Sequence, residues 1–531
     1  MNSIRTIYHI ARADFLERVR RSSFLFTLGA AIYLGYAVNA EIIYLKIGQY
    51  RGVLNSAYVG TLTTLVLISF LTLFGFYLVR NTLERDRQTR VGQIIAATPL
   101  KSIQYILGKI LSNVSVFIVM IAILIIAASA MQLLGGESSV FEFGRLAAPF
   151  VFYALPVMII ISSLAVLFEN VQWLRGSFGS VAYFFLWSYM LIFPLSTPNH
   201  IYDWNGIRTI MDSMQAALSK INPDYGGGFD ITFDPLPKDG LKTFVWQGID
   251  WSVQVILSRI LWFGVALGTC LVPVAFFRRF DPAREKQSRP ASPKRILDKS
   301  GDVLLNASSV IKDSHSVSFS KKLAPVVMRY SFVRMLLAEL RLMLKGLPWW
   351  WYAVACGLLI ASLSSPLAIA RKILFPIIWI WPLALWSAMG NREARYHTSQ
   401  LLFSSPAFLY RQLPAIWAAG VIVALITGSG VGIRFLITSN WSGFGAWTVG
   451  ALFVPSLAIA SGVLSCGSRL FEVVYIVLWY VGALNAEKAP VLDFMGATDL
   501  SITTGMPLIY LALTILLLVA AVFGRQRQLH L

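Results

Sequence analysis

The sequence predicts an all-α membrane protein with about twelve transmembrane helices in two tandem six-helix repeats, each preceded by an amphipathic elbow helix. Composition, long apolar runs and a weak internal repeat all support this fold class. Of the 531 residues, 56% are hydrophobic and only 13% are charged, whereas soluble domains average about 25% charged residues. So little charge could not cover a water-exposed surface, while a lipid-facing surface needs none across the hydrocarbon core.

The first half, residues 1–280, begins with an amphipathic stretch over 1–22 that carries five arginines. No small-residue cleavage site follows, so we interpret it as an interfacial elbow helix and not as a cleaved signal. Runs of about 20 apolar residues can cross the bilayer, and only helices satisfy all backbone groups within one such run. Six runs lie near 24–40, 58–79, 110–134, 146–168, 177–196 and 251–277.

The second half, residues 328–531, follows a basic segment at 281–327. This segment is rich in Lys, Arg, Ser and Pro and has no periodic apolar face. It is typical of a solvated cytoplasmic linker along an anionic membrane surface. Six further apolar runs lie near 348–364, 373–390, 412–432, 444–465, 471–486 and 506–523.

Basic residues indicate the orientation. Lys and Arg concentrate at both termini and in the segments that follow even-numbered spans. Because positive charge favours the cytoplasmic side, we expect both termini to be cytoplasmic.

The two halves match weakly in the connection that follows their second span. A gapless alignment of 85–109 with 392–416 pairs four polar or proline positions. The pairs are Arg85 with Arg392, Asp86 with Glu393, Gln93 with Gln400, and Pro99 with Pro406. The elbows also match, with Arg12 and Glu17 opposite Arg334 and Glu339, and the fourth spans align Pro156 with Pro455. Several matches in one order indicate a duplicated unit.

Both matched connections, 80–109 and 391–411, have a charged start, an apolar patch and a Ser/Thr-Pro pair. This order predicts a short surface helix in each, started at Thr98-Pro99 and Ser405-Pro406 by a hydroxyl cap and a first-turn proline. An ordinary cytoplasmic turn is the alternative. The apolar patches are Ile94, Ile95, Leu100 and Ile103 in the first half, and Leu401, Leu402, Phe403, Phe408 and Leu409 in the second.

The longest connection on the outer side is 197–250, between the fifth and sixth apolar runs of the first half. Apolar residues from Ile207 to Ile221 follow helical spacing, and a short alternating stretch comes after the glycines at 226–228. We interpret the connection as a small outer cap, with a loosely ordered loop as the alternative.

Catalytic, metal and nucleic-acid sites are not indicated. The sequence lacks a phosphate-binding loop, its five histidines are scattered, and its three cysteines form no metal quartet. The net charge of +19 is distributed between apolar runs and not along one soluble face. Arg259 is the clearest charge within a span, which makes it either a functional residue or a tie between two helices.

The segment 83–113 resembles the first cytoplasmic loop of the type-2 ATP-binding cassette transporter permeases. The resemblance lies in the elbow at Arg12–Glu17, the charges at Glu84–Arg87, Ile94-Ile95, Thr98-Pro99 and Gly108-Lys109. The second half departs from it, with Ala415-Ile416 where Gly-Lys is expected. The resemblance implies a double-length permease with two fused six-span halves.

This resemblance also implies a division of labour. The chain would be the permease of an exporter for a lipid, glycan, peptide or drug-like cargo in the bacterial cytoplasmic (inner) membrane. Separate ATPase subunits, two copies, would bind ATP-Mg, so the chain itself would carry no cofactor and no enzymatic activity; membrane lipids would be its other partners. The expected coupling residues are Asp86, Ile94, Ile95, Thr98, Pro99, Leu100, Glu393, Leu401, Leu402, Ser405 and Pro406. At the elbows we expect Arg12 to pair with Asp86 and Arg334 with Glu393.

An ion-coupled secondary transporter with twelve spans is the alternative function. Twelve spans, a basic central linker and cytoplasmic termini fit such carriers equally well. Ion coupling usually needs carboxylates or histidines within the spans, and these are nearly missing here.

Cysteine labelling tests the orientation. In a background without the three native cysteines, a cysteine at Gly227 should react with an impermeant thiol reagent from outside. A cysteine at Ser292 should react only after the membrane is permeabilised, because the linker is expected in the cytoplasm. The opposite pattern would reverse the topology.

Overall fold

The structure is a computed structural model whose described residues cover most of both halves. The predicted linker 281–327 lies outside them. Described are 3–20, 22–89, 91–138, 140–197, 200–222, 228–232, 241–277, 280, 331–345, 347, 349–366, 369–396, 398, 402–404, 408–484, 486 and 490–529.

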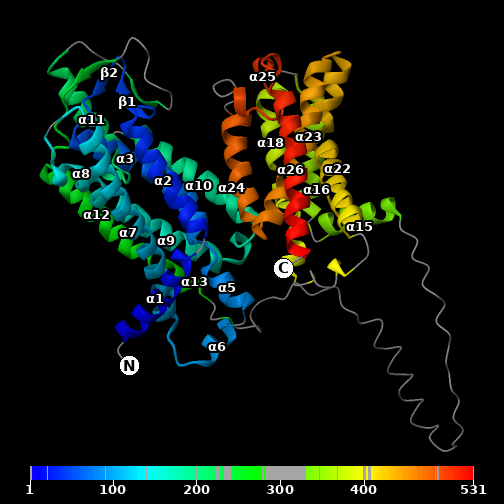
Figure 1. The fold of residues 1–531 in the computed structure, drawn as a ribbon, viewed down its shortest axis with the longest axis horizontal. Helices are drawn as coiled ribbons and strands as arrows, with labels where there is room; N and C mark the ends of the chain where they lie inside the picture. The colour runs from blue at the N-terminus through cyan, green and yellow to red at the C-terminus, as the bar shows by residue number, and fades with distance from the viewer. Residues whose placement is uncertain are drawn as a thin grey trace, which may run out of the picture.

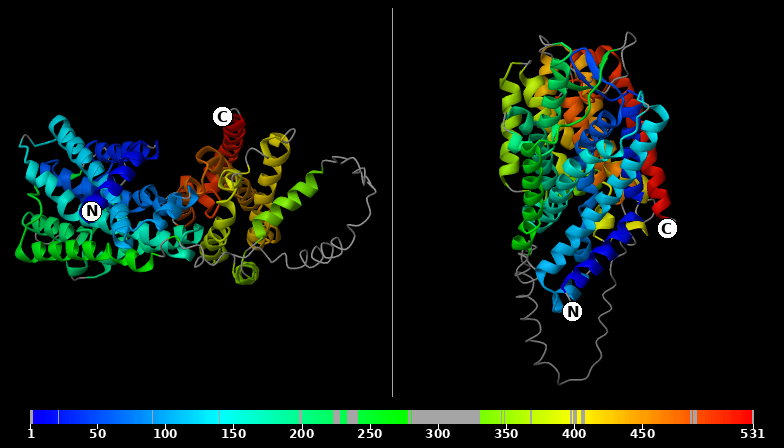
Figure 2. Two further views of the ribbon diagram at one scale, coloured as in Figure 1. Left: turned by 90° about the horizontal axis from the view of Figure 1, so that it is seen from below. Right: turned by 90° about the vertical axis from the view of Figure 1, so that its left-hand side faces the viewer.

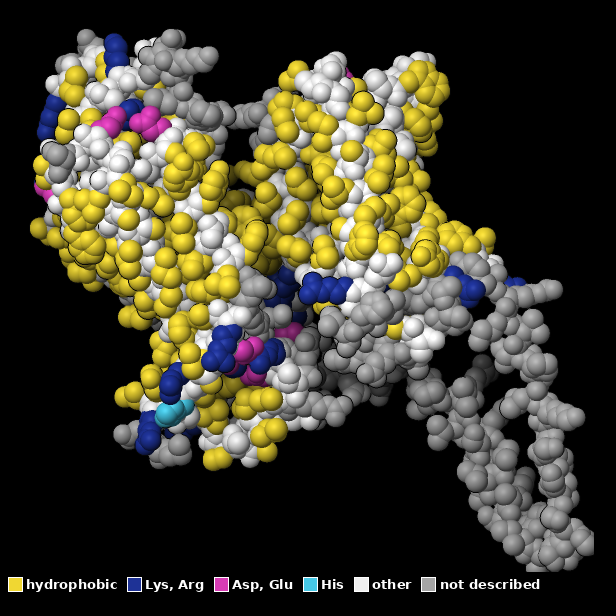
Figure 3. All heavy atoms as spheres, in the orientation of Figure 1, with side chains coloured by type: hydrophobic (Ala, Val, Ile, Leu, Met, Phe, Trp, Pro, Cys, Tyr) yellow, Lys and Arg dark blue, Asp and Glu magenta, His cyan; other side chains and the backbone are white. Residues whose placement is uncertain are grey.

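Two helical bundles lie side by side (Figures 1 and 2). Figure 3 shows an apolar belt across both bundles and a gathering of charged side chains at their lower end. Both ends of the chain lie toward this lower end, which we call the loop end (Figure 1). The opposite end, which carries strands in the first bundle, is the sheet end. The belt and the helices confirm a helical membrane protein.

The first bundle contains α1 to α13. Its elements are α1 Ser3–Val19, α2 Ser22–Asn39, β1 Tyr44–Ile47, β2 Tyr50–Gly52, α3 Ser56–Phe70, η1 Leu71–Gly75, α4 Phe76–Val79, α5 Thr82–Gln88, α6 Val91–Ala97, α7 Ser102–Gly135, α8 Phe143–Pro149, η2 Phe150–Ala154, α9 Leu155–Asn170, η3 Gln172–Leu174, α10 Ser177–Ser196, η4 His200–Tyr202, α11 Ile207–Ser219, β3 Phe229–Thr232, β4 Lys242–Phe244, α12 Val253–Thr269 and α13 Val272–Phe276.

The second bundle contains α15 to α26. Its elements are α15 Phe332–Leu344, α16 Trp349–Ser364, η5 Ala370–Leu374, α18 Phe375–Ile380, α19 Leu383–Trp386, α20 Arg392–Arg395, α22 Phe408–Ile437, α23 Trp441–Ser465, α24 Arg469–Leu478, η6 Trp479–Leu484, η7 Pro490–Leu492, α25 Asp499–Thr503 and α26 Met506–Leu529.

Among the described residues, eight helices are long and apolar enough to cross a membrane. Two helix pairs pass the same test only when each pair is taken together: α1 with α2, bent by 73°, and α15 with α16, bent by 105°. Counting each pair as one span gives ten. The predicted runs at 373–390 and 471–486 are instead assembled from short segments. Pro382 separates α18 from α19, because proline lacks the N–H that would continue the helix.

A small four-stranded sheet at the sheet end was not predicted. Its order is β3-β1-β2-β4, with β1 antiparallel to β2 and β3, and β2 parallel to β4. Gly48 turns the β1–β2 hairpin with a φ of +56°, where glycine meets no steric cost. The helical spacing in the outer connection is confirmed by α11, which buries Ile210 and Met214 beside this sheet.

Arg51 fastens the sheet to the end of α7. Its guanidinium donates to both carboxylate oxygens of Glu137, at 3.0 and 2.7 Å, and lies 3.0 Å from the carboxylate of Glu41. The hydrogen bond from Arg51 lowers the pKa of Glu137. The two-pronged pair therefore fixes the register of the outer cap on the bundle.

The two bundles meet where α10 packs on α24. Phe184 lies against Trp479 and Tyr480, with ring centroids 6.2 and 5.4 Å apart. Nearer the loop end, the hydroxyl of Ser180 donates to Glu472 of α24. The interface thus has an aromatic centre and a polar edge at the loop end.

Candidate functional site

The first loop leaves its span through a sharp turn at Asn81. This residue has a φ of +99°, a left-handed conformation that Asn tolerates better than most residues. The helix α5 then begins at Thr82, and the buried carboxylate of Glu169 accepts from the backbone N–H groups of residues 81 to 84. A carboxylate at a helix N-terminus satisfies the free donors and the helix dipole. The end of the fourth span therefore holds the start of the loop.

The elbow α1 crosses the start of α7 at Gly108. A Cβ atom at this position would lie 2.8 Å from the side chain of Ile10, closer than real Cβ contacts. The glycine of the Gly-Lys pair thus permits the close crossing of the two helices. At the aligned position in the second half, Ala415 is fully buried, and α15 packs on α22 there.

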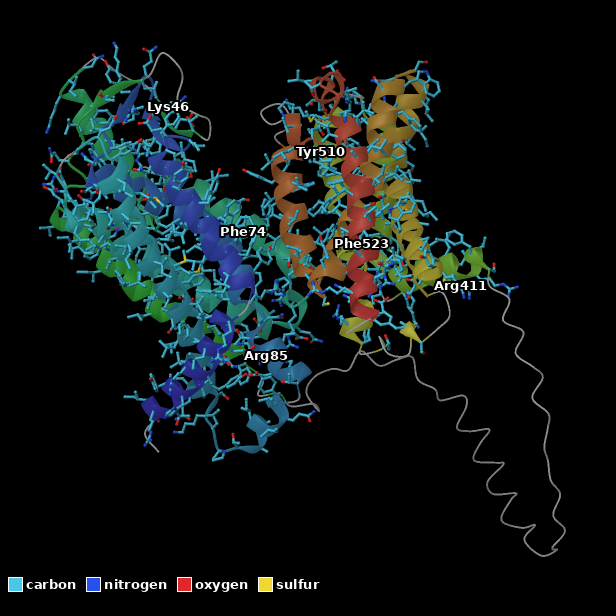
Figure 4. The ribbon with its side chains drawn as sticks, in the orientation of Figure 1. Lys46, Phe74, Arg85, Arg411, Tyr510 and Phe523 are labelled. Carbon is cyan, nitrogen blue, oxygen red and sulfur yellow. The ribbon has the colours of Figure 1, made fainter. Side chains whose placement is uncertain are left out.

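Ion pairs fasten the first elbow to the first loop. Glu17 of α1 pairs with Arg85 of α5, at the lower end of the first bundle (Figure 4). Lys109, only 3% exposed, lies 2.7 Å from Asp14 of the elbow and 2.8 Å from Asp86 of the loop. The Lys of the Gly-Lys pair therefore bridges an elbow carboxylate and a loop carboxylate, which would otherwise repel each other.

The second half repeats the first of these pairs. Glu339 of α15 lies 3.0 Å from Arg392 of α20, at the positions aligned with Glu17 and Arg85. Glu393 is aligned with Asp86, but Ile416 stands at the position of Lys109. Its carboxylate instead pairs with Arg525 of α26 at 2.9 Å and accepts from Gln412 at 3.1 Å. A cation from the last span replaces the missing lysine.

The predicted elbow pairs are therefore wrong. Arg12 and Arg334 are exposed, and their expected partners Asp86 and Glu393 bind Lys109 and Arg525. In the elbow-to-loop ion pairs that do form, Glu17 and Glu339 of the elbows bind Arg85 and Arg392 of the loops, opposite to the expected polarity. An arginine pointing away from the bundle can reach lipid headgroups or water, so it gains little from a buried acceptor.

The first surface helix forms, with different ends from those predicted. It is α6, Val91–Ala97, and Thr98-Pro99 follows it instead of starting it. The hydroxyl of Thr98 donates to the carbonyl of Ile95 at 2.7 Å and closes the last turn of α6. The Thr98 hydroxyl therefore closes the C-terminal end of the helix before Pro99 and does not cap a helix that begins after it.

The apolar residues of the first patch divide into two sets. Ile95 and Leu100 are half-buried against a small core that contains Leu83 and Tyr105. Ile94 is 67% exposed and Ile103 is 41% exposed, and Val91, not predicted, is 40% exposed. The first set holds the loop on the bundle, and the second faces away from it.

The second patch is only partly described. Leu401, Ser405 and Pro406 lie outside the described residues. Leu402, Phe403 and Leu409 are half-buried. The guanidinium of Arg525 lies 5.6 Å over the ring of Phe403. This patch therefore lies beside the ion pair of Arg525 with Glu393.

A cross-bundle contact reaches the first loop, and sequence reasoning missed it. Arg469, at the start of α24, donates to the carbonyl of Arg80 at 2.9 Å and to the side chain of Asn81. Arg80 in turn donates to the carbonyl of Leu174 at 2.7 Å. The second bundle is thus hydrogen-bonded to the turn at which the first loop begins. No local motif could have indicated a contact across 388 positions.

Arg259 lies on α12 near the sheet end, far from the loops. Its side chain is 2% exposed, donates to the backbone carbonyl of Asp203 at 2.5 Å, and lies 4.5 Å over the ring of Tyr153. Within the described part of the chain, no group of three His, Cys, Asp or Glu side chains could hold a metal ion.

Residues 30–223 match the family described as ABC-2 family transporter protein. Residues 30–223 are thus similar to ABC-2 family transporter proteins. This match spans α2 to α11 and therefore includes the first loop with Asp86 and α6, while Arg259 and the second bundle lie beyond it. No curated protein and no solved structure matches the chain. The family match and the membrane-spanning helices support a multi-pass membrane component of a transporter.

The two elbow pairs should differ in strength. Glu339 and Arg392 are 9% and 21% exposed, whereas Glu17 and Arg85 are 34% and 43% exposed. Glu339→Gln leaves Arg392 without its partner in a largely buried site and should cost about 2 kcal/mol. Glu17→Gln should cost under about 1 kcal/mol. Thermal unfolding of the purified chain in detergent measures both.

Arg12→Gln is the matched control and should leave the unfolding midpoint unchanged. Reversing both charges, Glu339→Arg with Arg392→Glu, should recover part of the loss from either reversal alone. A large drop in the unfolding midpoint of Arg12→Gln would support the rejected pairing of Arg12 with Asp86.

Proposed function

We propose that the chain is the membrane permease of an ATP-driven exporter and that two separate ATPase subunits bind at its loop end. ATP-Mg is bound and hydrolysed on those subunits, and the chain moves a lipid, glycan, peptide or drug-like cargo. The double length supplies both halves of the pathway in one polypeptide. The match to ABC-2 transporters supports the transport role.

The observation that carries the proposal is the exposed apolar face of α6. Val91 and Ile94 point away from the bundle, while Ile95 and Leu100 of the same segment pack onto it. An exposed apolar face on a loop that is fastened by ion pairs is suited to a protein partner. Each aliphatic side chain buried by that partner contributes roughly 1.5–3 kcal/mol.

The contacts around α5 support a route for transmitting force. A partner that moves α6 also moves α5, whose N-terminus rests on Glu169 of the fourth span. The turn at Asn81 is held by Arg469 of the other bundle. Movement of the loop would therefore act on two spans of one bundle and on the contact between bundles, as rigid-body switching requires.

The positions of the acidic residues favour this function over ion-coupled transport. Glu169 and Glu472 lie at the loop ends of their helices. Glu339 and Glu393 form ion pairs with Arg392 and Arg525, also at the loop end. No described span carries a carboxylate midway between its ends. A proton or sodium site near the bilayer midplane would need one.

The proposed location is the bacterial cytoplasmic membrane, with both termini and the loop end in the cytoplasm. The clustering of Lys and Arg at the loop end supports this side (Figure 3). Both ends of the chain lie toward that end, as an even number of crossings requires (Figure 1).

Changing the exposed face of α6 tests the proposal. Val91→Asp with Ile94→Asp should abolish co-purification of the proposed partner ATPase, because the apolar contact is lost and two charges are introduced. The purified chain alone should hydrolyse no ATP. Gln93→Asp is the control, since it adds a charge to the same helix without removing an apolar side chain. Intact ATPase binding by the double variant would remove the docking role of α6.

The cross-bundle contact can be tested separately. Arg469→Gln should leave ATPase binding intact, because α6 is unchanged, and should lower cargo transport per ATP hydrolysed several-fold. Arg434→Gln, which removes a 3.1 Å bond to the carbonyl of Leu363 within the second bundle, is the control. Equal coupling in the two variants would show that force does not pass through Arg469.

A further inference from the structure

A cavity of about 250 Å³ lies between the fourth and sixth spans of the first bundle, close to the sheet end. Its walls are Ala148, Phe152, Trp251, Ile256, Ile260 and Phe263, and Arg259 also lines it. Phe152 and Ile260 are 40% and 61% exposed, so the cavity opens on the outside of the bundle, where lipid would lie. Its volume exceeds that of an apolar protein cavity of about 150 Å³ that accepts benzene.

Arg259 is incompletely satisfied. One nitrogen, Nη2, donates to the carbonyl of Asp203 and to Ser258. The other two, Nε and Nη1, are buried and have no hydrogen-bond acceptor among the described residues. The charge of the Asp203 carboxylate acts on the guanidinium, but its hydrogen bonds come from the backbone of Arg208 and from Thr209.

This arrangement is costly without a ligand. Arginine stays protonated in proteins, so it cannot escape burial by losing its charge. The ring of Tyr153 compensates part of the charge, but free N–H groups in an apolar site still lack acceptors. Water is poorly suited to complete them, because the remaining walls are apolar and offer it few partners.

We infer that this cavity binds an anionic acyl lipid, with the head group at Arg259 and the acyl chain along Phe152, Trp251 and Ile260. A phosphate or carboxylate supplies strong acceptors for the free N–H groups. The acyl chain fills the apolar space and continues into the bilayer. Both requirements of the cavity are met by one molecule.

The depth of the site agrees with such a lipid. Arg259 lies seven residues beyond Ser252, the N-cap of α12, which is about 10 Å along the helix. Val253 and Leu257 on the same helix are 74% and 60% exposed, so an apolar face adjoins the cavity. A head group at this depth reaches the end of the span, while its chain remains within the hydrocarbon.

The experiment measures lipid retention by the full chain and involves no ATPase, so its failure would leave the proposed function untouched. The chain is held in micelles with equal amounts of phosphatidylglycerol and phosphatidylcholine of the same acyl length, and the retained lipid is identified by native mass spectrometry. Wild type should retain phosphatidylglycerol about tenfold over phosphatidylcholine, because the choline cation of phosphatidylcholine neutralises its own phosphate and is repelled by the buried guanidinium. Inorganic phosphate should not displace it.

Two variants test the charged group and the apolar cavity separately. Arg259→Gln should abolish the preference, and Ala148→Phe should reduce retention by filling the cavity while the charge stays. Arg434→Gln, a change in another arginine near the sheet end, should retain the wild-type preference. If Arg259→Gln does not fold, Ala148→Phe decides alone. No preference in wild type, displacement by inorganic phosphate, or full retention in Ala148→Phe would overturn the inference.

Discussion

The structure at the loop end depends on one constraint: a carboxylate placed beside a membrane span needs a cation or a set of hydrogen-bond donors close to it. Glu17 and Arg85, and equally Glu339 and Arg392, satisfy it in corresponding positions of the two halves. Each pair sets where the elbow lies on its bundle. The elbow position in turn determines the start of the next span and the direction in which the loop leaves, and thus which side chains of α6 face away from the bundle.

The two halves neutralise their loop carboxylates with cations from different helices. In the first, Lys109 serves Asp86 and an elbow carboxylate together. In the second, Glu393 depends on Arg525 of the final span. The spans differ as well, because Pro382 interrupts one that is continuous in the first half. Matched positions in the two halves therefore do not require equal movements, and Arg469 ties the second half to the first loop.

Sequence reasoning located the spans well, because about 20 apolar residues leave the backbone few alternatives. It also found Glu17, Arg85, Glu339 and Arg392, since each had a partner at the matched position of the other half. The predicted pairing, of Arg12 with Asp86 and of Arg334 with Glu393, was wrong because helical spacing does not show which charge faces the bundle. The sheet was missed because β1 and β2 are only four and three residues long. Arg469 was missed because its contacts are set entirely by the packing of two bundles.

The reliance of Glu393 on Arg525 has a consequence for biogenesis. These residues are 132 positions apart. During synthesis, Lys109 follows Asp86 within the same connection, so this pair can form while later spans are still missing. The pair of Glu393 and Arg525 cannot form until α22, α23, α24 and α26 have all been made. The final packing of the second half around Glu393 therefore depends on α26.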